Sequence, residues 1–417
     1  MEQIGYLNKF RQLAIDVLAT IKKPTKRNED WRYSNLKLLD IVLKEKSMVQ
    51  PLAIPPFDDA FYLIVFVDGK LQEEWSNLPK KGVELSNVEE ELKKLRFEDG
   101  FDSKYQVLQN YSKMECEFVI NLTLTLEKPL KIWHLYKTHH TSNTFVKIGD
   151  GVDITIYEEF VRGEDFTNNV NQVTKIELGK EAGCKHFKKH DLINNSNFIY
   201  TSEVICNKNA RYNNYVAHHG HSSYRQETEC SLQGDGAMAN FHGIIIGNNK
   251  ENYDIIIKVK HKSSHTKSFQ HYNQIFNDQS SGAFYTKVEI LEQLSNVEAH
   301  QLNKNLLLND EARVFFRPEL DICSDDVVCS HGATVGNIDE NALYYLMSRG
   351  IDIDIAKQLL LQGFLSSVFE NQNLSEEEYE AFLLEISKKA RNTSDEHEEC
   401  TRVRDKTQTP KHDDTNF

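Results

Sequence analysis

The region from about residue 117 to residue 328 consists largely of short segments in which apolar and polar residues alternate. Asp153–Glu158 and Phe118–Leu126 are two clear examples. Alternation with a period of two residues is typical of strands that bury one face. Asn, Gly and Ser residues interrupt the segments, as in Gly247–Asn249, and supply the turns between strands. The pattern predicts a protein of mainly β structure.

Small residues followed closely by an aromatic residue recur within this region. Gly183, Ala210 and Ala237 follow one another at steps of about 27 residues, and Ala312 has the same context, although Ala283 interrupts the count. A period in the twenties within β sequence favours a β-solenoid, in which each coil stacks only on its neighbours. A stack of β-sandwiches fits the alternation as well.

The chain before this region has a different pattern. Apolar residues between Ile4 and Ile21 follow a helical rhythm that Pro24 ends. Phe61–Val67 reads as a strand closed by an Asp-Gly turn, and residues 88–97 as a short charged helix. We therefore expect residues 1–115 to form helices and a small α/β lead-in, with the β core over residues 116–335.

After the core the pattern becomes helical. Asp339 is placed to cap a helix that Gly350 ends, and residues 355–369 form a second apolar helix. Ser375–Glu378 reads as a capping box that opens a third. We expect a helical domain over residues 336–391. The polar stretch 392–417, with almost no apolar residues, should be disordered.

Charge and cysteine content narrow the possible functions. A net charge of −14 over 417 residues argues against nucleic acid or an anionic membrane as the main partner. The seven cysteines are odd in number and form no CxxC motif, so reduced thiols in a cytoplasm fit better than a disulfide framework. The N-terminus has no apolar signal core, and no run of residues is apolar and long enough to span a membrane.

The segment Asp325–Gly336 (DDVVCSHGATVG) carries the most suggestive chemistry. Cys329 and His331 are two residues apart, so both project from one face if the segment is a strand. A soft thiolate beside an imidazole suits iron, zinc or an iron–sulfur cluster. The alternative is a buried cysteine and a hydrogen-bonded histidine at the end of a sheet, because a single Cys-x-His pair is a weak signal.

Other histidines and aromatic residues have simpler explanations. Of the 16 histidines, 14 lie between His134 and His331. They could bind metal, but polar side chains that form hydrogen-bonded ladders between coils explain them better. In the segment Asn28–Ser34 (NEDWRYS), Trp31 and Tyr33 are expected to dock an N-terminal arm on the core.

Several longer segments together resemble one family. These are Gln301–Leu308 (QLNKNLLL), Pro318–Ile322 (PELDI), the DDVVCSHGATVG segment and Leu346–Ile351 (LMSRGI). The chain is similar, over nearly its whole length, to the SufB/SufD family of the SUF iron–sulfur cluster assembly machine. The resemblance implies a right-handed parallel β-helix core, an N-terminal α/β lead-in and a C-terminal helical domain. One departure is Phe284–Thr286, where many members carry Phe-x-Gly after a Gly-Ala turn, which puts the local turn geometry in doubt.

The resemblance also implies a role. SufB carries a cysteine in the strand corresponding to Gln301–Asn303, where this chain has none, whereas Cys-Ser-His-Gly-Ala-Thr is the SufD form. A SufD-type subunit pairs with SufB and docks the ATPase SufC through its C-terminal helices. It shares a transient iron–sulfur cluster or iron with SufB, at His331 and secondarily Cys329, and reduced flavin is a further cofactor expected of the complex. The sequence leaves open whether a homodimer forms when SufB is absent.

Two other classes of function remain open. Some parallel β-helices are polysaccharide-cleaving enzymes, but Asp325 and Asp326 are strand neighbours that face opposite ways and cannot act on one bond. The third possibility is a free-standing metal-binding β-solenoid that uses its histidines without a partner. The chain is not itself the ATPase, because it contains no GxxxxGK[ST] motif. We expect a non-catalytic scaffold subunit.

Overall fold

The computed structural model describes residues 2–41, 58–95, 97, 100–114, 118–136, 140–162, 169–191, 196–370, 372, 374, 375 and 378. The chain divides into two compact units, residues 1–335 and 336–417. The third C-terminal helix expected after Ser375 and the expected disordered tail lie largely outside the described residues.

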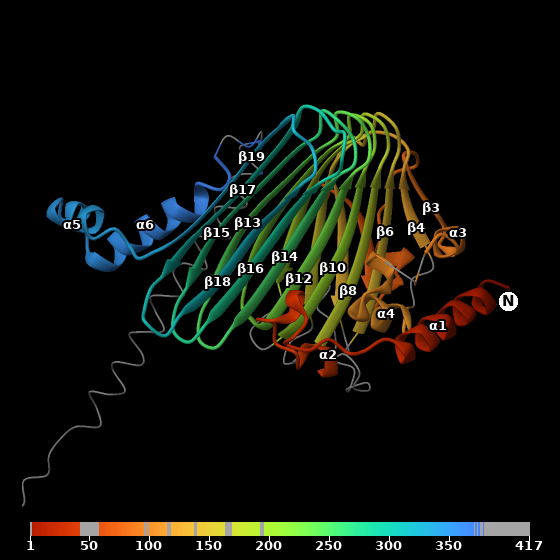
Figure 1. Cartoon of the computed structure of the whole chain (residues 1–417). Helices are drawn as coiled ribbons and strands as arrows, with labels where there is room; N and C mark the ends of the chain where they lie inside the picture. The colour runs from red at the N-terminus through yellow and green to blue at the C-terminus, as the bar shows by residue number, and fades with distance from the viewer. Residues whose placement is uncertain are drawn as a thin grey trace, which may run out of the picture. The chain divides into compact units, whose positions relative to one another are not determined.

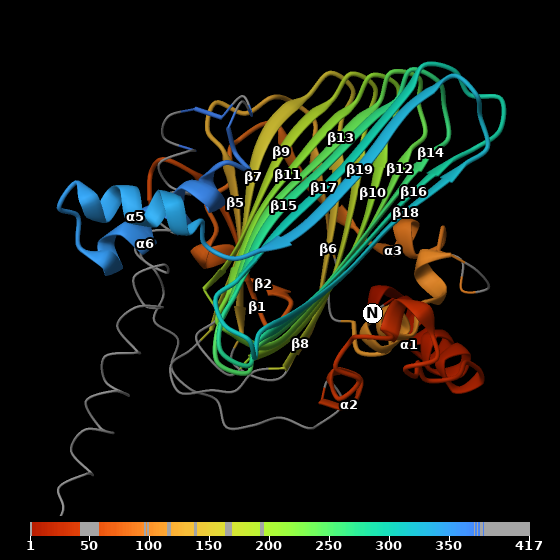
Figure 2. The same ribbon diagram turned by 60° about the vertical axis from the view of Figure 1, so that its left-hand side comes forward.

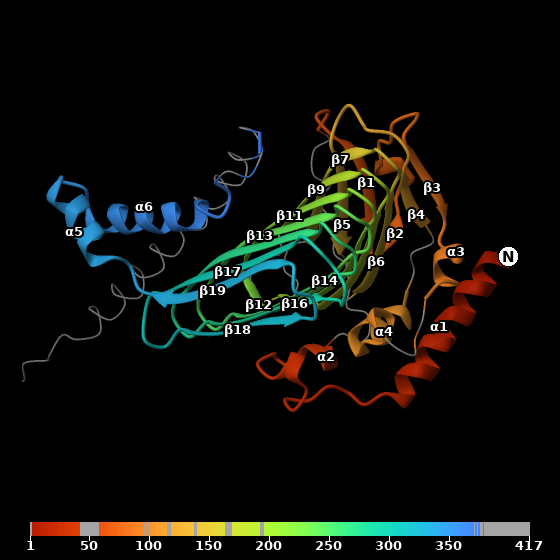
Figure 3. The same cartoon turned by 45° about the horizontal axis from the view of Figure 1, so that its top comes forward.

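The first unit is a parallel β-solenoid of about seven turns (Figure 1). Each turn contributes one strand to each of two sheets, and strands of successive turns pair in parallel (Figures 2 and 3). The nine-stranded sheet comprises β3 (Val83–Asn87), β4 (Phe118–Leu122), β6 (His140–Ile148), β8 (Asn169–Leu178), β10 (Ser196–Cys206), β12 (His221–Leu232), β14 (Asn252–His261), β16 (Ser281–Ile290) and β18 (Arg313–Ile322).

The ten-stranded sheet contains the alternate strands of the chain. It comprises β1 (Tyr62–Val67), β2 (Lys70–Leu71), β5 (Leu130–Tyr136), β7 (Asp153–Arg162), β9 (Gly183–Asp191), β11 (Arg211–His219), β13 (Met238–Gly247), β15 (Lys267–Phe276), β17 (Val297–Leu307) and β19 (Val327–Gly336). The antiparallel strands β2 and β3 occupy the N-terminal edges of the two sheets, so parallel pairing ends there. At the other end the last strands are β18 and β19.

The alternation in the sequence is explained by the two faces of each strand. Inward residues such as Ile255, Ile257 and Val259 on β14 form one continuous apolar core between the sheets. Residues between them, such as Lys258, face outward. The prediction of a β-solenoid is therefore confirmed, and the β-sandwich alternative is wrong because strands n and n+2 pair in parallel throughout the coils.

The small residues noticed in the sequence lie at the corners of the coils. Asn209 and Gly236 have positive φ angles of 55° and 73°, and the buried Ala210 and Ala237 follow them directly. Asn and Gly tolerate this conformation better than other residues do. Ala283 interrupted the regular spacing of these small residues because it lies inside β16, a strand of the nine-stranded sheet, and not at a corner.

Three expectations about local structure need correction. β4 ends at Leu122, so the alternation up to Leu126 overstated the strand, and the helix expected over residues 88–97 is only α3 (Glu89–Leu92). The Phe284–Thr286 segment, where an unusual turn seemed possible, is regular strand paired with β14 and β18. The doubt about turn geometry therefore disappears.

Most of the N-terminal helices lie over the outer face of the nine-stranded sheet (Figure 1), whereas residues 73–75 contact β1 of the ten-stranded sheet. They form a second apolar cluster in which Phe10 and Tyr111 contact edge to face. The helices of this region are α1 (Glu2–Thr20), η1 (Glu29–Trp31), α2 (Leu38–Ile41), η2 (Glu73–Trp75), α3, η3 (Phe101–Ser103) and α4 (Tyr105–Tyr111). Asp68 and Gly69 have positive φ angles, as the predicted Asp-Gly hairpin turn requires.

The second unit contains α5 (Glu340–Ser348) and α6 (Ile353–Ser366). Asp339 caps α5 by accepting hydrogen bonds from the backbone N–H groups of Asn341 and Ala342, as expected. The capping box is also present: the Ser375 N–H donates to Glu378 and the Glu378 N–H donates to the Ser375 hydroxyl. Among the described residues, no helix has the length and apolarity needed to cross a membrane.

Candidate functional site at the free edge of the solenoid

The strands β18 and β19 are the last strands of the two sheets, and parallel pairing stops at them. Within the described residues each of these strands has a neighbour on one side only. Their side chains are unusually exposed for apolar residues: Val328 is 64% exposed, and Phe315 and Phe316 are each 41% exposed. An edge strand with exposed apolar residues is a template for pairing with another strand.

Cys329 and His331 both lie in β19, as the sequence predicted, and they share its inward face. Cys329 packs against the core between the sheets and contacts the backbone of Ala299 on β17. Partial burial raises the pKa of the Cys329 thiol, although the hydrogen bond from the Ala299 backbone opposes this. His331, two residues later, is exposed because the core ends at this strand.

This pair is not a complete metal site by itself. Among the described residues, no group of three or more His, Cys, Asp or Glu side chains is positioned to hold a metal ion. An imidazole and a thiol supply two ligands at most, whereas zinc and iron–sulfur irons are usually four-coordinate. Any metal or cluster held here needs ligands beyond the described residues of the chain. The same finding gives the free-standing metal-binding alternative no site in the described parts of the chain.

The expected arm extends from the N-terminal helices to this edge. Tyr33 stacks on Phe315 of β18, with ring centroids 4.4 Å apart and an interplanar angle of 11°. Glu29 forms an ion pair with Arg317 of the same strand. Both contacts tie residues near the start of the chain to its last coil, so the interpretation of Trp31 and Tyr33 as docking residues is confirmed.

A buried ionic network that the sequence analysis missed holds the arm. The guanidinium of Arg225 is fully buried, lies 3.7 Å from the ring centre of Trp31 and donates to Asp254 and Glu227. The Ser34 hydroxyl also donates to Asp254. Burial would raise the pKa of Glu227, but Lys104 and Arg225 outweigh it and hold that pKa below its usual value. The only signal for this cluster in the sequence is that charged residues occupy alternate, outward-facing positions along β12 and β14.

A second buried network lies inside the solenoid. Glu158 accepts a hydrogen bond of 2.9 Å from Tyr200 and lies 3.2 Å from the Nε2 atoms of His134 and His186. Burial would raise the pKa of Glu158, but the two imidazoles hold it below its usual value. Burial lowers the pKa of Lys188, on the same inner wall, to about 7. These groups are buried on all sides, so they organise the core and are not placed to meet a large substrate.

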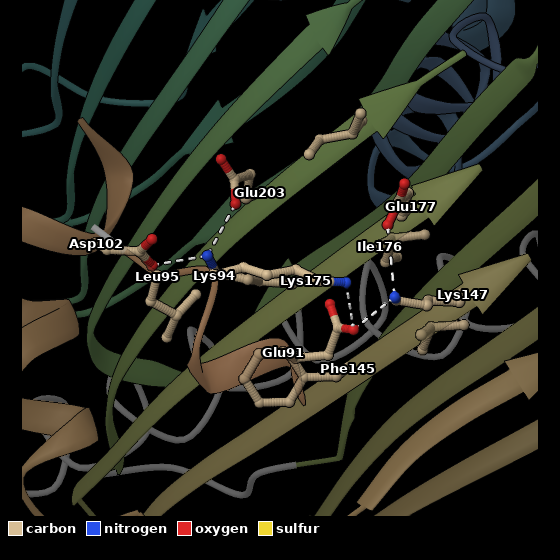
Figure 4. A pocket seen from close by; sticks show the side chains of 12 residues that line it. Glu91, Lys94, Leu95, Asp102, Phe145, Lys147, Lys175, Ile176, Glu177 and Glu203 are labelled. Carbon is tan, nitrogen blue, oxygen red and sulfur yellow. Dashed lines mark hydrogen bonds and ion pairs between the residues drawn. The ribbon is translucent and has the colours of Figure 1, made fainter. Parts of the chain in front are cut away.

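A pocket of about 260 Å³ lies where α3 and η3 meet β6, β8 and β10 (Figure 4). Lys147 bridges Glu91 and Glu177, and Lys175 lies 2.6 Å from Asp102 and 2.9 Å from Glu203. These two ammonium groups are therefore each neutralised by two carboxylates of the chain, and the ammonium group of Lys94 pairs with Glu91. The pocket contributes to docking the N-terminal region and offers no unpaired charge to a ligand.

Within the described residues, the molecule is therefore a parallel solenoid with antiparallel strands at one end and an exposed strand edge at the other. The chain belongs to the family of SUF-system iron–sulfur cluster assembly proteins with a SufBD core domain, whose family model matches residues 135–364.

Relatives agree with this assignment. The chain is 24% identical to the iron–sulfur cluster assembly SufBD family protein slr0076 of Synechocystis, over 86% of each chain. It is 23% identical to the SufD protein of Escherichia coli, over 83% of this chain and 85% of that protein. A segment covering 34% of this chain is 31% identical to SufD of Bacillus subtilis. The chain is SufD-like, as the sequence segments suggested.

Proposed function

We propose that this chain is the SufD-type subunit of a cytoplasmic SufB–SufC–SufD complex, in which it is a scaffold without turnover of its own. The observation that carries the proposal is the free edge of β18 and β19, which combines exposed apolar residues with an exposed histidine. Pairing with a SufB strand at this edge would bury Val328 and Phe315. The same pairing would bring SufB side chains close to His331.

His331 is the residue we assign to the cargo of the complex. A neutral imidazole can ligate iron, and a thiolate from the partner would supply a further ligand, so neither subunit alone would hold the nascent cluster. Cys329 faces the same way, but its partial burial and raised pKa disfavour the thiolate that a metal needs. We therefore rank Cys329 second. Reduced flavin is a further proposed cofactor of the complex, for which the described residues suggest no particular position.

The second unit is the proposed docking site for the ATPase SufC. On α5 the side chains of Tyr344 and Tyr345 are 74% and 56% exposed, and on α6 Ile355 is 53% exposed. Apolar and aromatic residues of this kind are typical of protein interfaces rather than of free helices. Replacing Tyr344 and Ile355 together with Glu should abolish co-purification with SufC. Deleting residues 393–417 should leave it intact, and loss of SufC from the tail deletion alone would contradict this assignment.

The test of the whole proposal is His331→Ala in a cell that depends on the SUF machine. We expect the variant to fold and to co-purify with SufB and SufC, while cluster assembly is lost. Cys329→Ser should have a smaller effect. His265→Ala is the matched control, because His265 is exposed at a coil corner and pairs with Asp235. Normal assembly with His331→Ala would exclude the shared-ligand role. Dissociation of the complex would make His331 an interface residue.

A further inference from the structure

The inner face of the last coils differs from the rest of the interior. Gln270 and Gln274 on β15, and Gln301 and Asn303 on β17, all have side chains at most 4% exposed. Within the described residues, neither the nitrogen nor the oxygen of any of these four carboxamides has a hydrogen-bond partner. Eight buried polar atoms therefore lie together in two neighbouring strands, which Figure 2 shows side by side.

The register of the sheet aligns these groups with the free edge. Gln270 lies directly beside Gln301. Contacts between β17 and the chain at β19 extend this register: the Val297 N–H donates to the backbone carbonyl of Asp326, and the His300 ring lies 2.7 Å from the Ser330 hydroxyl. These contacts place residue 331 beside residue 301. Gln270, Gln301 and His331 therefore occupy the same inward position on β15, β17 and β19.

A dry interior cannot explain this arrangement. The combined cost of burying eight unpartnered amide atoms would be comparable to the whole net free energy of unfolding of a typical protein. Elsewhere in the same core a glutamine is satisfied: the amide of Gln172 donates to the hydroxyls of Thr144 and Thr174. The four carboxamides therefore need partners other than the described residues of the chain.

The chemistry of the four groups identifies those partners. Carboxamides offer donors and acceptors together and carry no charge, so they match a small neutral molecule that does both. The apolar residues that close the other side of the interior, among them Phe284 and Val288, do not favour an ion. Water meets these conditions, and buried waters typically make about three hydrogen bonds to polar groups of this kind.

We propose that the inner faces of β15 and β17 enclose a hydrated chamber, which binds a row of water molecules and runs in register to His331 at the free edge. The inference stands on the geometry of the interior alone and does not depend on the proposed cluster-assembly function.

Oxygen-17 magnetic relaxation dispersion on the full chain tests the chamber directly, because it counts long-lived internal waters. We expect the count to fall in a Gln270→Met, Gln301→Met double variant, in which two carboxamides are replaced by apolar side chains of similar size. Gln172→Met, in a different coil, should not change the waters of the chamber. An unchanged count in the double variant would overturn the proposal.

Thermal unfolding of the single variant Gln301→Met gives an independent result. If the interior is dry, removing an unpartnered amide should raise the melting temperature. If it is hydrated, the substitution breaks a row of water-mediated bonds, and the melting temperature should fall by about 1–3 °C. Gln301→Asn keeps the amide and should recover part of the loss. A higher melting temperature for Gln301→Met would contradict the chamber even if the double variant failed to fold.

Discussion

The outer face under the N-terminal arm and the free edge of β18 and β19 differ in how their contacts are completed. Under the arm, Arg225 is fully buried and its charge is neutralised by Asp254 and Glu227 of the same chain. At the edge, Val328 and His331 are exposed and the strand has no second neighbour among the described residues. The comparison teaches that the chain itself supplies the opposite charges of its buried network, whereas the edge offers backbone groups of the kind that can pair with a further strand.

The largest effect should come from breaking the buried network. Arg225→Met leaves Asp254 buried without its counter-charge and removes one of the cationic partners of Glu227, so the free energy of unfolding should fall by about 3–5 kcal/mol. Denaturant unfolding of the purified chain measures this loss. The control is Arg211→Met, which breaks an exposed ion pair with Asp153 and should cost about 1 kcal/mol or less. Equal losses in the free energy of unfolding for the two variants would show that the buried ion pairs stabilise the fold no more than the exposed pair does.

The second-largest loss of stability should come from acid, which protonates a histidine buried in the interior. Burial lowers the pKa of His261 to about 4, and its ring nitrogens lie 2.8 Å and 2.9 Å from the hydroxyls of Thr266 and Ser268. A group whose pKa is lower in the folded state is fully stabilising above its unfolded pKa of about 6.5, and the contribution is lost as the pH falls towards 4.

The loss from His261 should reach about 3 kcal/mol at most over that range of pH. Unfolding measured at a series of pH values should show stability falling with acid in the natural chain, and falling less steeply in His261→Gln. Identical pH profiles would show that His261 is not held neutral by the fold.

A smaller effect is expected where the arm reaches the edge. Tyr33→Ala removes the stack on Phe315, which is partly exposed to solvent, and should cost about 1 kcal/mol. Thermal unfolding can compare it with Trp31→Ala, which removes the buried ring over Arg225 and should cost about 3 kcal/mol or more. A Tyr33 variant that costs as much as the Trp31 variant would mean that the edge contact, not the buried network, anchors the arm.

The smallest change in stability should occur on the free edge itself. Val328→Glu places a charge on an exposed side chain, so the free energy of unfolding of the isolated chain should change by about 0.5 kcal/mol or less. Co-purification with SufB should nevertheless be lost, because a charge on an edge strand opposes pairing with another strand. A destabilised monomer would show that Val328 contributes to the fold. Unchanged binding would place the SufB contact elsewhere.

The sequence predicted the parts of the fold that repeat or that end an element. Alternation along Asp153–Glu158 in β7, the cap at Asp339 and the Asp-Gly turn after β1 are local patterns, and each was found in the structure. The position of Cys329 and His331 on one face of a strand was predictable for the same reason, since it follows from the period of a strand.

The contacts between distant segments were not predictable from one sequence. Nothing near Ser34 indicates that its hydroxyl donates to Asp254, because the two residues are brought together only when the arm crosses the coils. Gln270 and Gln301 likewise look like ordinary surface glutamines until the register places them side by side in the interior. A parallel solenoid converts separations of about 30 residues into neighbours, and the irregular lengths of its turns hide that spacing.

The stack of Tyr33 on Phe315 has a consequence for synthesis of the chain. The arm cannot reach its final position until the ribosome has made the last coil, some 280 residues later, which takes roughly 15 to 60 seconds at typical bacterial and eukaryotic rates. Arg225 and Asp254 emerge before that coil and can already pair with Ser34. Docking of the arm should therefore begin at Trp31 and Ser34, and in a chain stalled before β18 these two residues would hold the arm while Tyr33, between them, lacked its stacking partner.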